Sequence, residues 1–398
     1  MKKEKFAFEI INGEAIIKEY FGGEADKDLV FPATYKGYPV TEIDEDAFED
    51  FSEVDWIFDN MIIPETIKNI PKLTLRDAVT KNIIVDSKNQ NYRSINGVLF
   101  NKKGTILIRC SAAKEGEYVI PVSVKCIKEE AFMHSALTRI EIPSSVTSIG
   151  IYAFSGCEEL TELNIPDSVK NIGEYAFQGC RKVKNITIPK GITKLSHCMY
   201  ADCSSIKKII IPSNITESEG GEFIDCTQLQ KVIIEPGIKN IGDNMFHGCI
   251  KLKDITIPNG ITSIGEYAFS GCSSLTSINI PDSVADIGGY AFCDTAFYND
   301  ESNWENGFLY IGDCLIAAKE TISGDISIKE GTRLIANFAF NNCDKIESIT
   351  IPASVTNIGQ DAFVVKAWFS KPWEYIKSIN ADPANEFYKS IDGKLYNK

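Results

Sequence analysis

IPDSVKNIGEYAFQGCRKVKNIT, residues 165–187, is the stretch that decides the fold, because its pattern of apolar, glycine and cysteine letters returns later in the chain. Residues 257–279 are IPNGITSIGEYAFSGCSSLTSIN, and another copy begins IPDSVADIGGYAF at Ile280. An internal repeat of this length indicates a solenoid, in which each coil packs on its two neighbours. The sequence therefore predicts a stack of coils.

The repeat has a period of 23 residues, and its aromatic position keeps this step over seven copies. The aromatic column is Phe154, Phe177, Tyr200, Phe223, Phe246, Phe269 and Phe292. The cysteine column is Cys157, Cys180, Cys203, Cys226, Cys249 and Cys272. Degraded copies occur at Phe48 and Phe132 upstream and at Phe340 and Phe363 downstream. One array therefore accounts for nearly the whole chain.

The letters of one repeat also explain why it needs neighbours. Leu163 and Ile165 alternate with polar residues, which is typical of a short, half-buried strand. Pro166 cannot donate to a strand ladder, so the strand ends there. We expect Phe177 to plug the far side of the coil. A single coil cannot bury these side chains, whereas stacked coils bury them continuously.

The motif L-x-x-I-x-I-P-x-x-V-x-x-I-G-x-x-A-F-x-G-C resembles the BspA-type leucine-rich repeat. That family consists of bacterial surface or secreted proteins and also occurs in some protozoa. The resemblance implies a leucine-rich repeat solenoid, an α/β-type superhelix with a parallel β-sheet on one face and short helical turns and loops on the other. It also implies a cell-surface or secreted location and a protein partner, either a host extracellular protein or another cell-surface protein.

Two β-rich runs, residues 91–110 and 303–328, interrupt the repeats and are predicted to be inserted β-hairpins, each introduced by an Asn-Gly pair. We divide the single solenoid into a β-rich N-terminal cap (1–46), degenerate repeats (47–88), a first hairpin insertion (89–120), regular repeats (121–297), a second insertion (298–328), and terminal repeats with an incomplete hairpin (329–398). The last letters, FYKSIDGKLYNK, repeat NYRSINGVLFNK from the first insertion. This predicts either a fragment of a longer protein or a frayed end.

The formal net charge of −14 disfavours nucleic acid and anionic membrane surfaces as partners. The N-terminal letters MKKEKFAFEIINGEA lack the apolar core of a signal peptide. No stretch approaches the roughly 20 apolar residues of a membrane span. We therefore expect no nucleic acid, no membrane insertion and a monomer.

We predict no catalytic residue, metal or cofactor. His134, His197 and His247 lie in no Ser/His/Asp or H-E-x-x-H pattern, and His247 is expected on the solvated surface. Stacked cysteines would have Cβ atoms about one strand spacing apart, beyond the roughly 3.5–4.5 Å that a disulfide prefers. We expect the cysteine column to be buried thiols. Cys293 and Cys314 flank the second insertion and are the pair that could meet.

The aromatic residues outside the core column could have either of two roles, in ligand binding or in packing. Tyr152, Tyr175, Tyr267 and Tyr290 share one repeat position and could bind sugar or peptide. Packing over the turn, with the hydroxyl in water, is the favoured interpretation. Trp368 and Trp373 break the repeat and could form an exposed patch or cover a distorted last coil.

The outward residues of the strands are the best binding candidates, because they differ from coil to coil while the other positions of the repeat stay the same. The candidate site is Arg139, Glu162, Asn185, Lys208, Ile210, Lys231, Ile233 and Asp254. Ile210 and Ile233 stand where other coils carry Asn or Thr, although β-branched residues also simply favour strands. We therefore predict a binding or adhesion module that uses the strand face. The alternatives are a structural spacer in a larger surface protein and, less favoured, an accessory domain of an enzyme.

Overall fold

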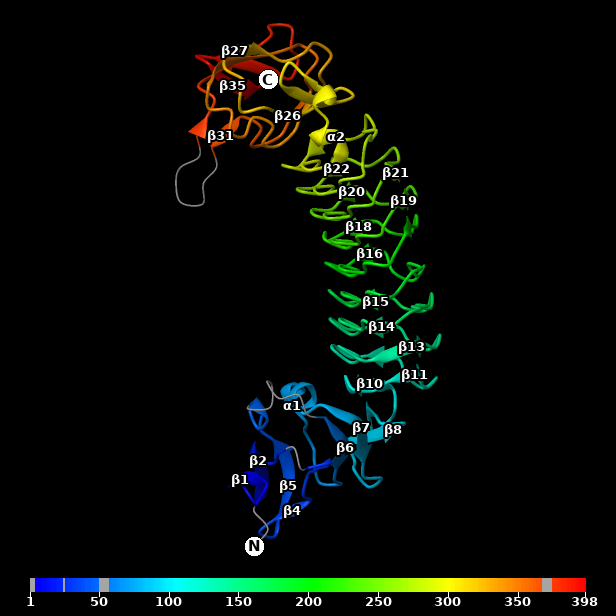
Figure 1. The fold of residues 1–398 in the computed structure, drawn as a ribbon. Helices are drawn as coiled ribbons and strands as arrows, with labels where there is room; N and C mark the ends of the chain where they lie inside the picture. The colour runs from blue at the N-terminus through cyan, green and yellow to red at the C-terminus, as the bar shows by residue number, and fades with distance from the viewer. Residues whose placement is uncertain (1–3, 24–25, 50–56, 367–373) are drawn as a thin grey trace. The chain divides into compact units, whose positions relative to one another are not determined.

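The computed structural model describes all residues except 1–3, 24–25, 50–56 and 367–373. The described chain forms two compact units, Met1–Gly191 and Ile192–Lys398, and each is considered by itself. Within each unit, coils stack so that equivalent short strands pair in parallel (Figure 1). The predicted solenoid of stacked parallel strands is confirmed.

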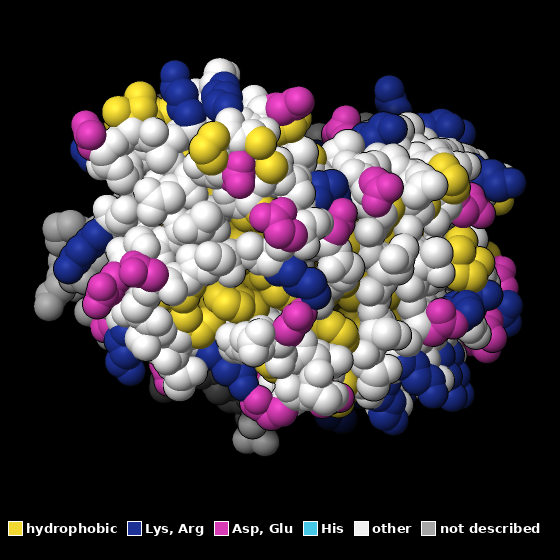
Figure 2. Space-filling view, turned by 90° about the horizontal axis from the view of Figure 1, so that it is seen from above, with side chains coloured by type: hydrophobic (Ala, Val, Ile, Leu, Met, Phe, Trp, Pro, Cys, Tyr) yellow, Lys and Arg dark blue, Asp and Glu magenta, His cyan; other side chains and the backbone are white. Residues whose placement is uncertain are grey.

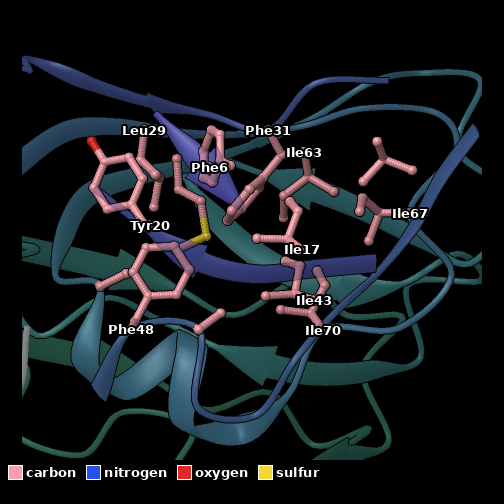
Figure 3. Packing of buried hydrophobic residues seen from close by; sticks show 14 of the residues in the cluster. Phe6, Ile17, Tyr20, Leu29, Phe31, Ile43, Phe48, Ile63, Ile67 and Ile70 are labelled. Carbon is pink, nitrogen blue, oxygen red and sulfur yellow. The ribbon is translucent and has the colours of Figure 1, made fainter. Parts of the chain in front are cut away.

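The N-terminal residues form a small sheet over a large aromatic cluster. β1 (Phe6–Ile11) pairs antiparallel with β2 (Glu14–Tyr20), which pairs in parallel with β5 (Tyr38–Ile43), and β5 pairs with β4 (Thr34–Tyr35). Figure 3 shows Phe6 and Tyr20 from this sheet in one buried cluster with Phe31, Phe48 and the isoleucines of the first coils. This buried cluster covers the start of the array, whose apolar interior would otherwise meet water.

Most coils carry a longer and a shorter strand, and each kind forms its own ladder. In the first unit the longer strands include β11 (Gly116–Val119) and β13 (Leu137–Glu141). The shorter strands of that unit are β12 (Cys126–Ile127), β14 (Ser148–Ile149) and β15 (Asn171–Ile172). Near the N-terminus β3 (Asp28–Val30), β6 (Phe58–Ile63) and β7 (Thr80–Val85) form a three-stranded parallel sheet.

The second unit repeats this arrangement. Its longer strands are β17 (Lys208–Ile211), β19 (Lys231–Ile234) and β21 (Asp254–Thr256). Its shorter strands are β16 (Lys194–Leu195), β18 (Glu217–Ser218), β20 (Asn240–Ile241), β22 (Ser263–Ile264) and β23 (Asp286–Ile287). Farther along, β27 (Gly324–Ser327), β29 (Ile346–Ile351) and β33 (Ser378–Ala381) form another parallel sheet, and β31 (Val364–Lys366) pairs antiparallel with β32 (Glu374–Tyr375).

The side opposite the longer strands consists of turns rather than the short helical turns expected there. In the described part of the chain, helix is limited to α1 (Lys72–Asp77), α2 (Ala296–Asn299), a 3-10 turn, Glu301–Asn303, and the 3-10 residue Glu49. None of these helices is long and apolar enough to cross a membrane. Tyr175 and Tyr267 show why helix does not form, because both have left-handed backbone angles, with φ of 55° and 53°. A residue in this conformation ends a right-handed helix.

The aromatic column forms the centre of each unit. In the second unit Phe246 is fully buried, and its ring is stacked 5.7 Å from that of Phe223 and 5.6 Å from that of Phe269. In the first unit the rings of Phe154 and Phe177 are 5.3 Å apart and nearly parallel. The stacking follows from the repeat itself, since each coil is a translated copy of the one before. The prediction of a buried aromatic column is confirmed.

The cysteine column also matches its prediction, since the structure keeps all twelve cysteines as thiols. The Sγ atoms of Cys157 and Cys249 donate to the carbonyls of Phe132 and Phe223, at 3.0 and 3.2 Å. Each bond thus joins one coil to the aromatic residue of the coil before. Burial raises the pKa of the Cys157 thiol to about 12, which keeps it protonated and unreactive at neutral pH.

Cys293 and Cys314 do not form the disulfide that their positions allowed. Cys314 opens the strand β26 (Cys314–Ala318), whose paired neighbours are β25 (Phe308–Ile311) and β28 (Leu334–Ile335). Its Sγ lies 3.4 Å from a carboxylate oxygen of Asp313. The possibility that the two thiols pair is therefore not realised, and Cys314 instead contacts Asp313.

Both predicted hairpin insertions are confirmed. In the first, β8 (Tyr92–Ile95) and β9 (Val98–Asn101) form the hairpin, and β10 (Ile106–Arg109) pairs antiparallel with β9 and parallel with β12. In the second, β24 (Trp304–Glu305) and β25 form the hairpin, and β26 pairs antiparallel with β25 and parallel with β28. β28 in turn pairs with β30 (Asn357–Ile358). A third strand therefore joins each hairpin to the ladder of shorter strands.

A buried asparagine anchors the first hairpin. The Asn89 side chain donates to the carbonyls of Pro64 and Ile67, at 2.8 and 2.9 Å, and accepts from the amides of Asn91 and Tyr92. The hairpin β34 (Tyr388–Ile391) and β35 (Lys394–Asn397) repeats the scheme with Asn385, which donates to the carbonyls of Pro352 and Val355 at 2.9 and 3.0 Å. Trp368 and Trp373 lie outside the described residues.

One coil of the second unit departs from the apolar pattern at two core positions. Ser218 stands where neighbouring coils carry Ile or Leu, and Glu222 where they carry Ala or Met. Glu222 is fully buried, and its Oε1 accepts from the Ser218 hydroxyl at 2.5 Å and from the Gly220 amide at 3.0 Å. Its Oε2 has no hydrogen-bond partner. Burial raises the pKa of this carboxyl above its usual value, and the Ser218 and Gly220 hydrogen bonds offset the shift only in part.

We predict that the double variant Ser218→Ile, Glu222→Met is more stable than the wild type at pH 8, by roughly 1–3 kcal/mol. Because the folded-state pKa is raised, the carboxyl's contribution to stability is fully present below its unfolded pKa and is lost as the pH rises through the folded value. The advantage of the variant should therefore grow from pH 4 to pH 8, as measured by urea unfolding. A constant difference across that range would contradict a buried, titrating Glu222.

Candidate binding surface

The outer face of the longer strands in the second unit gathers most of the predicted site. β17 and β19 pair in register, so that Lys208 lies beside Lys231 and Ile210 beside Ile233. Their alternating neighbours, such as Ile209, point inward and are buried. Ile210 remains 42% exposed, and Ile233 is partly exposed. Strand alternation thus places two isoleucines next to each other on the outside, as predicted.

Charged side chains flank this isoleucine pair. Lys231 forms an ion pair with Asp254, which lies beside it on β21. Both side chains are about half exposed, at 46% and 53%, so the pair contributes little to stability. Figure 2 shows that hydrophobic side chains reach the surface of the molecule in small groups, with charged side chains between them. On the strand face, the paired isoleucines likewise have Lys208, Lys231 and Asp254 as charged neighbours.

The other three predicted site residues belong to the first unit. Arg139 lies on β13, with its Nη2 3.2 Å from a carboxylate oxygen of Glu141 and its Nε 3.8 Å from one of Glu162. Glu162 is also joined to Arg139 by an isolated parallel bridge. Asn185 is exposed and lies outside any assigned strand. The eight predicted residues therefore form two groups, one in each unit, and their role in binding stays a prediction.

A second apolar row in the first unit was missed by the sequence reasoning. Val30, Ile62 and Ile84 are paired neighbours on β3, β6 and β7. Val30 is 49% and Ile84 43% exposed. They occupy the same outward repeat position as Ile210, and each is followed by an apolar residue, Phe31, Ile63 or Val85, that packs into the core. The signal was present in the letters LVFP and IIP, but the irregular spacing of the degenerate repeats hid it.

An acidic groove of about 400 Å³ runs along the ends of the shorter strands in the second unit. Its carboxylates come from Glu219, Asp243, Glu266, Asp286 and Asp361. Burial raises the pKa of the Glu266 carboxyl, and the nearby charge of Asp243 adds to the shift. Throughout the described residues, no group of three or more His, Cys, Asp or Glu could hold a metal ion. The carboxylates are spread along the groove rather than gathered around one point.

His247 is not solvated as expected. Its side chain is half-buried, and its Nδ1 is shielded from water without a hydrogen-bond partner. The reason is local, because the His247 carbonyl accepts from the Asp225 amide of the adjacent coil and so holds the residue against that coil. A variable repeat position therefore need not be an exposed one.

Comparison with known proteins shows which families and solved structures share this architecture. Residues 125–253 and 239–367 match the family described as a BspA-type leucine-rich repeat region with six copies. No curated protein sequence matches the chain. Similar solved structures include the pneumococcal vaccine antigen PcpA, with 18% identity, coverage of 97% of this chain and 94% of that one, and a TM-score of 0.55.

Two further structures are leucine-rich repeat proteins of other bacteria. The protein of Bacteroides ovatus ATCC 8483 has 20% identity, covers 89% of this chain and 95% of its own, and has a TM-score of 0.50. The protein of Eubacterium ventriosum ATCC 27560 has 26% identity, coverage of 73% and 70%, and a TM-score of 0.48. The likeness to PcpA and to the B. ovatus protein, at such identities, shows the fold alone. The family match spans more than half of the residues, and the chain therefore belongs to the BspA-type leucine-rich repeat family.

Proposed function

We propose that the chain is a non-catalytic binding or adhesion module of a bacterial cell-surface or secreted protein, and that it contacts its partner through the strand face. The family is typical of bacterial surface proteins, which supports the location. The observation that carries the site is the exposed pair Ile210 and Ile233 on neighbouring strands. The partner is a host extracellular protein or another cell-surface protein.

Two physical properties of this face favour binding. The isoleucines are held on paired strands whose inward residues are buried, so the surface loses little conformational entropy when a partner docks. An apolar centre with Lys208, Lys231 and Asp254 around it also has the composition of a contact patch, with an apolar core and a polar rim. A structural spacer needs no such patch.

The test measures binding of the full chain to purified extracellular-matrix and cell-surface proteins by biolayer interferometry. For any partner found, Ile210→Asp with Ile233→Asp should weaken binding by more than about 100-fold, since both changes place charge at the centre of the contact. Ile250→Asp is the matched control, because Ile250 is 43% exposed and lies in a turn of the same unit. It should leave affinity unchanged, and all variants should keep the wild-type melting temperature.

Binding that survives the double change would remove the strand face from the proposal. If binding were instead lost on changing Tyr152 and Tyr175, the site would lie on the turn side. Those two rings are stacked 4.8 Å apart and are partly exposed, so they are the strongest competing surface in the first unit.

A further inference from the structure

Each hairpin insertion has a small cavity beside the strand that joins it to the ladder of shorter strands. The first cavity, of about 70 Å³, has Arg109 of β10 in its wall, and the second, of about 100 Å³, has Ala317 of β26. The two places correspond, because β10 pairs with β12 as β26 pairs with β28. In both, the next residue of the strand donates its amide to the alanine of an Ala-Phe pair. A cavity at this position therefore comes with the insertion, whereas its lining differs.

The two cavities differ in charge. Arg109 in the wall of the first corresponds to Ala317 in the wall of the second. Glu130 and Phe338, which also line them, each stand directly before the Ala-Phe pair of their coil. No charged side chain is among the described residues that line the second cavity. The fold thus does not require an arginine or a glutamate at these positions.

Arg109 is a buried cation with unused hydrogen-bond donors. The residue is only 6% exposed, and its Nη1 donates to the Glu130 carbonyl at 2.5 Å. Its Nε is shielded from water without a partner, and among the described residues its guanidinium is in no ion pair. Burial lowers the pKa of the Arg109 guanidinium, and the charge of Glu130 offsets this only in part. A charge in such a place is costly unless an opposite charge joins it.

The nearby carboxylates are held by a different cation. The Nζ of Lys72, on α1, lies 2.7 Å from a carboxylate oxygen of Glu130 and 3.8 Å from one of Glu129. The lining holds three cations, Lys72, Arg109 and Lys128, but only these two carboxylates. One positive charge is therefore left over, and Arg109 is the buried residue among the five.

Size and lining select among the anions that could supply the missing charge. The volume of the first cavity equals that of roughly two water molecules in the liquid, which suits a carboxylate with a short carbon chain. Ile70, Leu75 and Ile108 provide apolar walls for such a chain. Glu129 and Glu130 repel a second negative charge, which disfavours phosphate and sulfate. A guanidinium also presents its donors in a planar fork that matches a carboxylate.

We propose that the first cavity, between α1 and β10, binds a small aliphatic monocarboxylate. The carboxylate accepts hydrogen bonds from the Arg109 guanidinium, and the carbon chain contacts the apolar walls. The bound anion neutralises the charge that the protein's own carboxylates leave uncompensated. This site is separate from the strand face, so its test and the test of the proposed function have independent outcomes.

Propionate is the probe, added to the full chain at constant ionic strength in exchange for chloride. We expect saturable binding, measured by saturation-transfer difference NMR on the propionate protons, and a matching saturable rise in the melting temperature. Phosphate and sulfate should bind at least about tenfold more weakly than propionate. The peptide Gly-Gly-Ala, whose carboxylate ends a longer chain, should also bind at least about tenfold more weakly, because the cavity has no room for it.

Three variants locate the site. Arg109→Met should abolish saturable binding, whereas Arg93→Met, which removes the same charge from an exposed residue of the first hairpin, should leave it unchanged. Arg109→Lys keeps the charge but lacks the planar fork, and it should weaken propionate at least about fivefold. Because the lysine variant keeps a cation at this position, it tests the site even if the methionine variant does not fold.

Four results would overturn the proposal. Absence of saturable propionate binding would leave the cavity to water, and binding that survives Arg109→Met and Arg109→Lys would place the anion elsewhere. Phosphate binding as tight as that of propionate would contradict the choice of a monocarboxylate. Tighter binding of Gly-Gly-Ala than of propionate would assign the site to the end of a partner chain.

Discussion

Phe246→Ala is expected to lower the free energy of unfolding by about 3–5 kcal/mol, because it empties the centre of the aromatic column. The Phe246 ring is fully buried and stacked between those of Phe223 and Phe269. The truncation therefore removes contacts with two coils as well as its own. Denaturant unfolding of the full chain, followed by circular dichroism, measures the loss.

Tyr267→Ala is the matched control for this prediction. Tyr267 is also stacked on the next coil, 5.2 Å from Tyr290, but it is 36% exposed. Its loss should cost less, about 1–2 kcal/mol, since a side chain that is 36% exposed gives up less buried surface than a fully buried ring. Equal shifts of the unfolding midpoint for the two variants would show that the buried column does not hold the coils together as described.

Asn89→Ala should lower the free energy of unfolding by roughly 2–4 kcal/mol, although it deletes only a few atoms. The side chain makes four hydrogen bonds, and its removal leaves the carbonyl groups of Pro64 and Ile67 without this partner. Amide hydrogen exchange should also speed up at Asn91 and Tyr92. Both effects follow from unsatisfied polar groups in a buried place.

The neighbouring residue supplies the control. Gln90 is exposed and its side chain reaches only the Lys88 carbonyl, so Gln90→Ala should change stability by less than about 0.5 kcal/mol. If Asn89→Ala proved no more costly than Gln90→Ala, the asparagine would not be the anchor of the hairpin.

The stacking of coils in this fold could be predicted because the 23-residue period is visible in the sequence. A 23-residue step fixes which side chains share a column, and stacking then follows from the need to bury Phe177 and its equivalents. The turn side could not be assigned in the same way. An apolar Ala-Phe pair fits a helical turn as well as an irregular one, and the left-handed φ of Tyr175 decides between them only in three dimensions.

The anchor asparagines and the buried glutamate show a different limit. Asn89 and Asn385 occur in the related letters DSKNQNY and DPANEFY, but a single asparagine in a loop has no pattern that marks it as buried. Glu222 visibly departs from its column, yet its partnership with Ser218 depends on how one turn folds back. Pairwise polar contacts of this kind are not periodic, so a periodic analysis misses them.

The position of the candidate surface could be predicted from the sequence, but the chemistry of its partner could not. Alternation along a strand placed Ile210 and Ile233 side by side on the outside, and the structure agrees. Val30 and Ile84 obey the same rule, but they lie in repeats whose spacing is irregular. The identity of a partner also depends on the partner's own surface, and the repeat positions of this chain carry no information about that surface.

The thiol-to-carbonyl bonds between coils have a consequence for how such a chain changes over generations. Each spans 25 or 26 residues and reaches the adjoining coil, so every donor finds an equivalent acceptor when one whole repeat is copied or lost. Loss of a single residue inside a coil has no such symmetry, because it changes the spacing of each donor–acceptor pair that spans the deletion. The gene can therefore grow and shrink in steps of 69 bases, and the letters that residues 165–187 and 257–279 share, 11 of 23, are what such copying would leave.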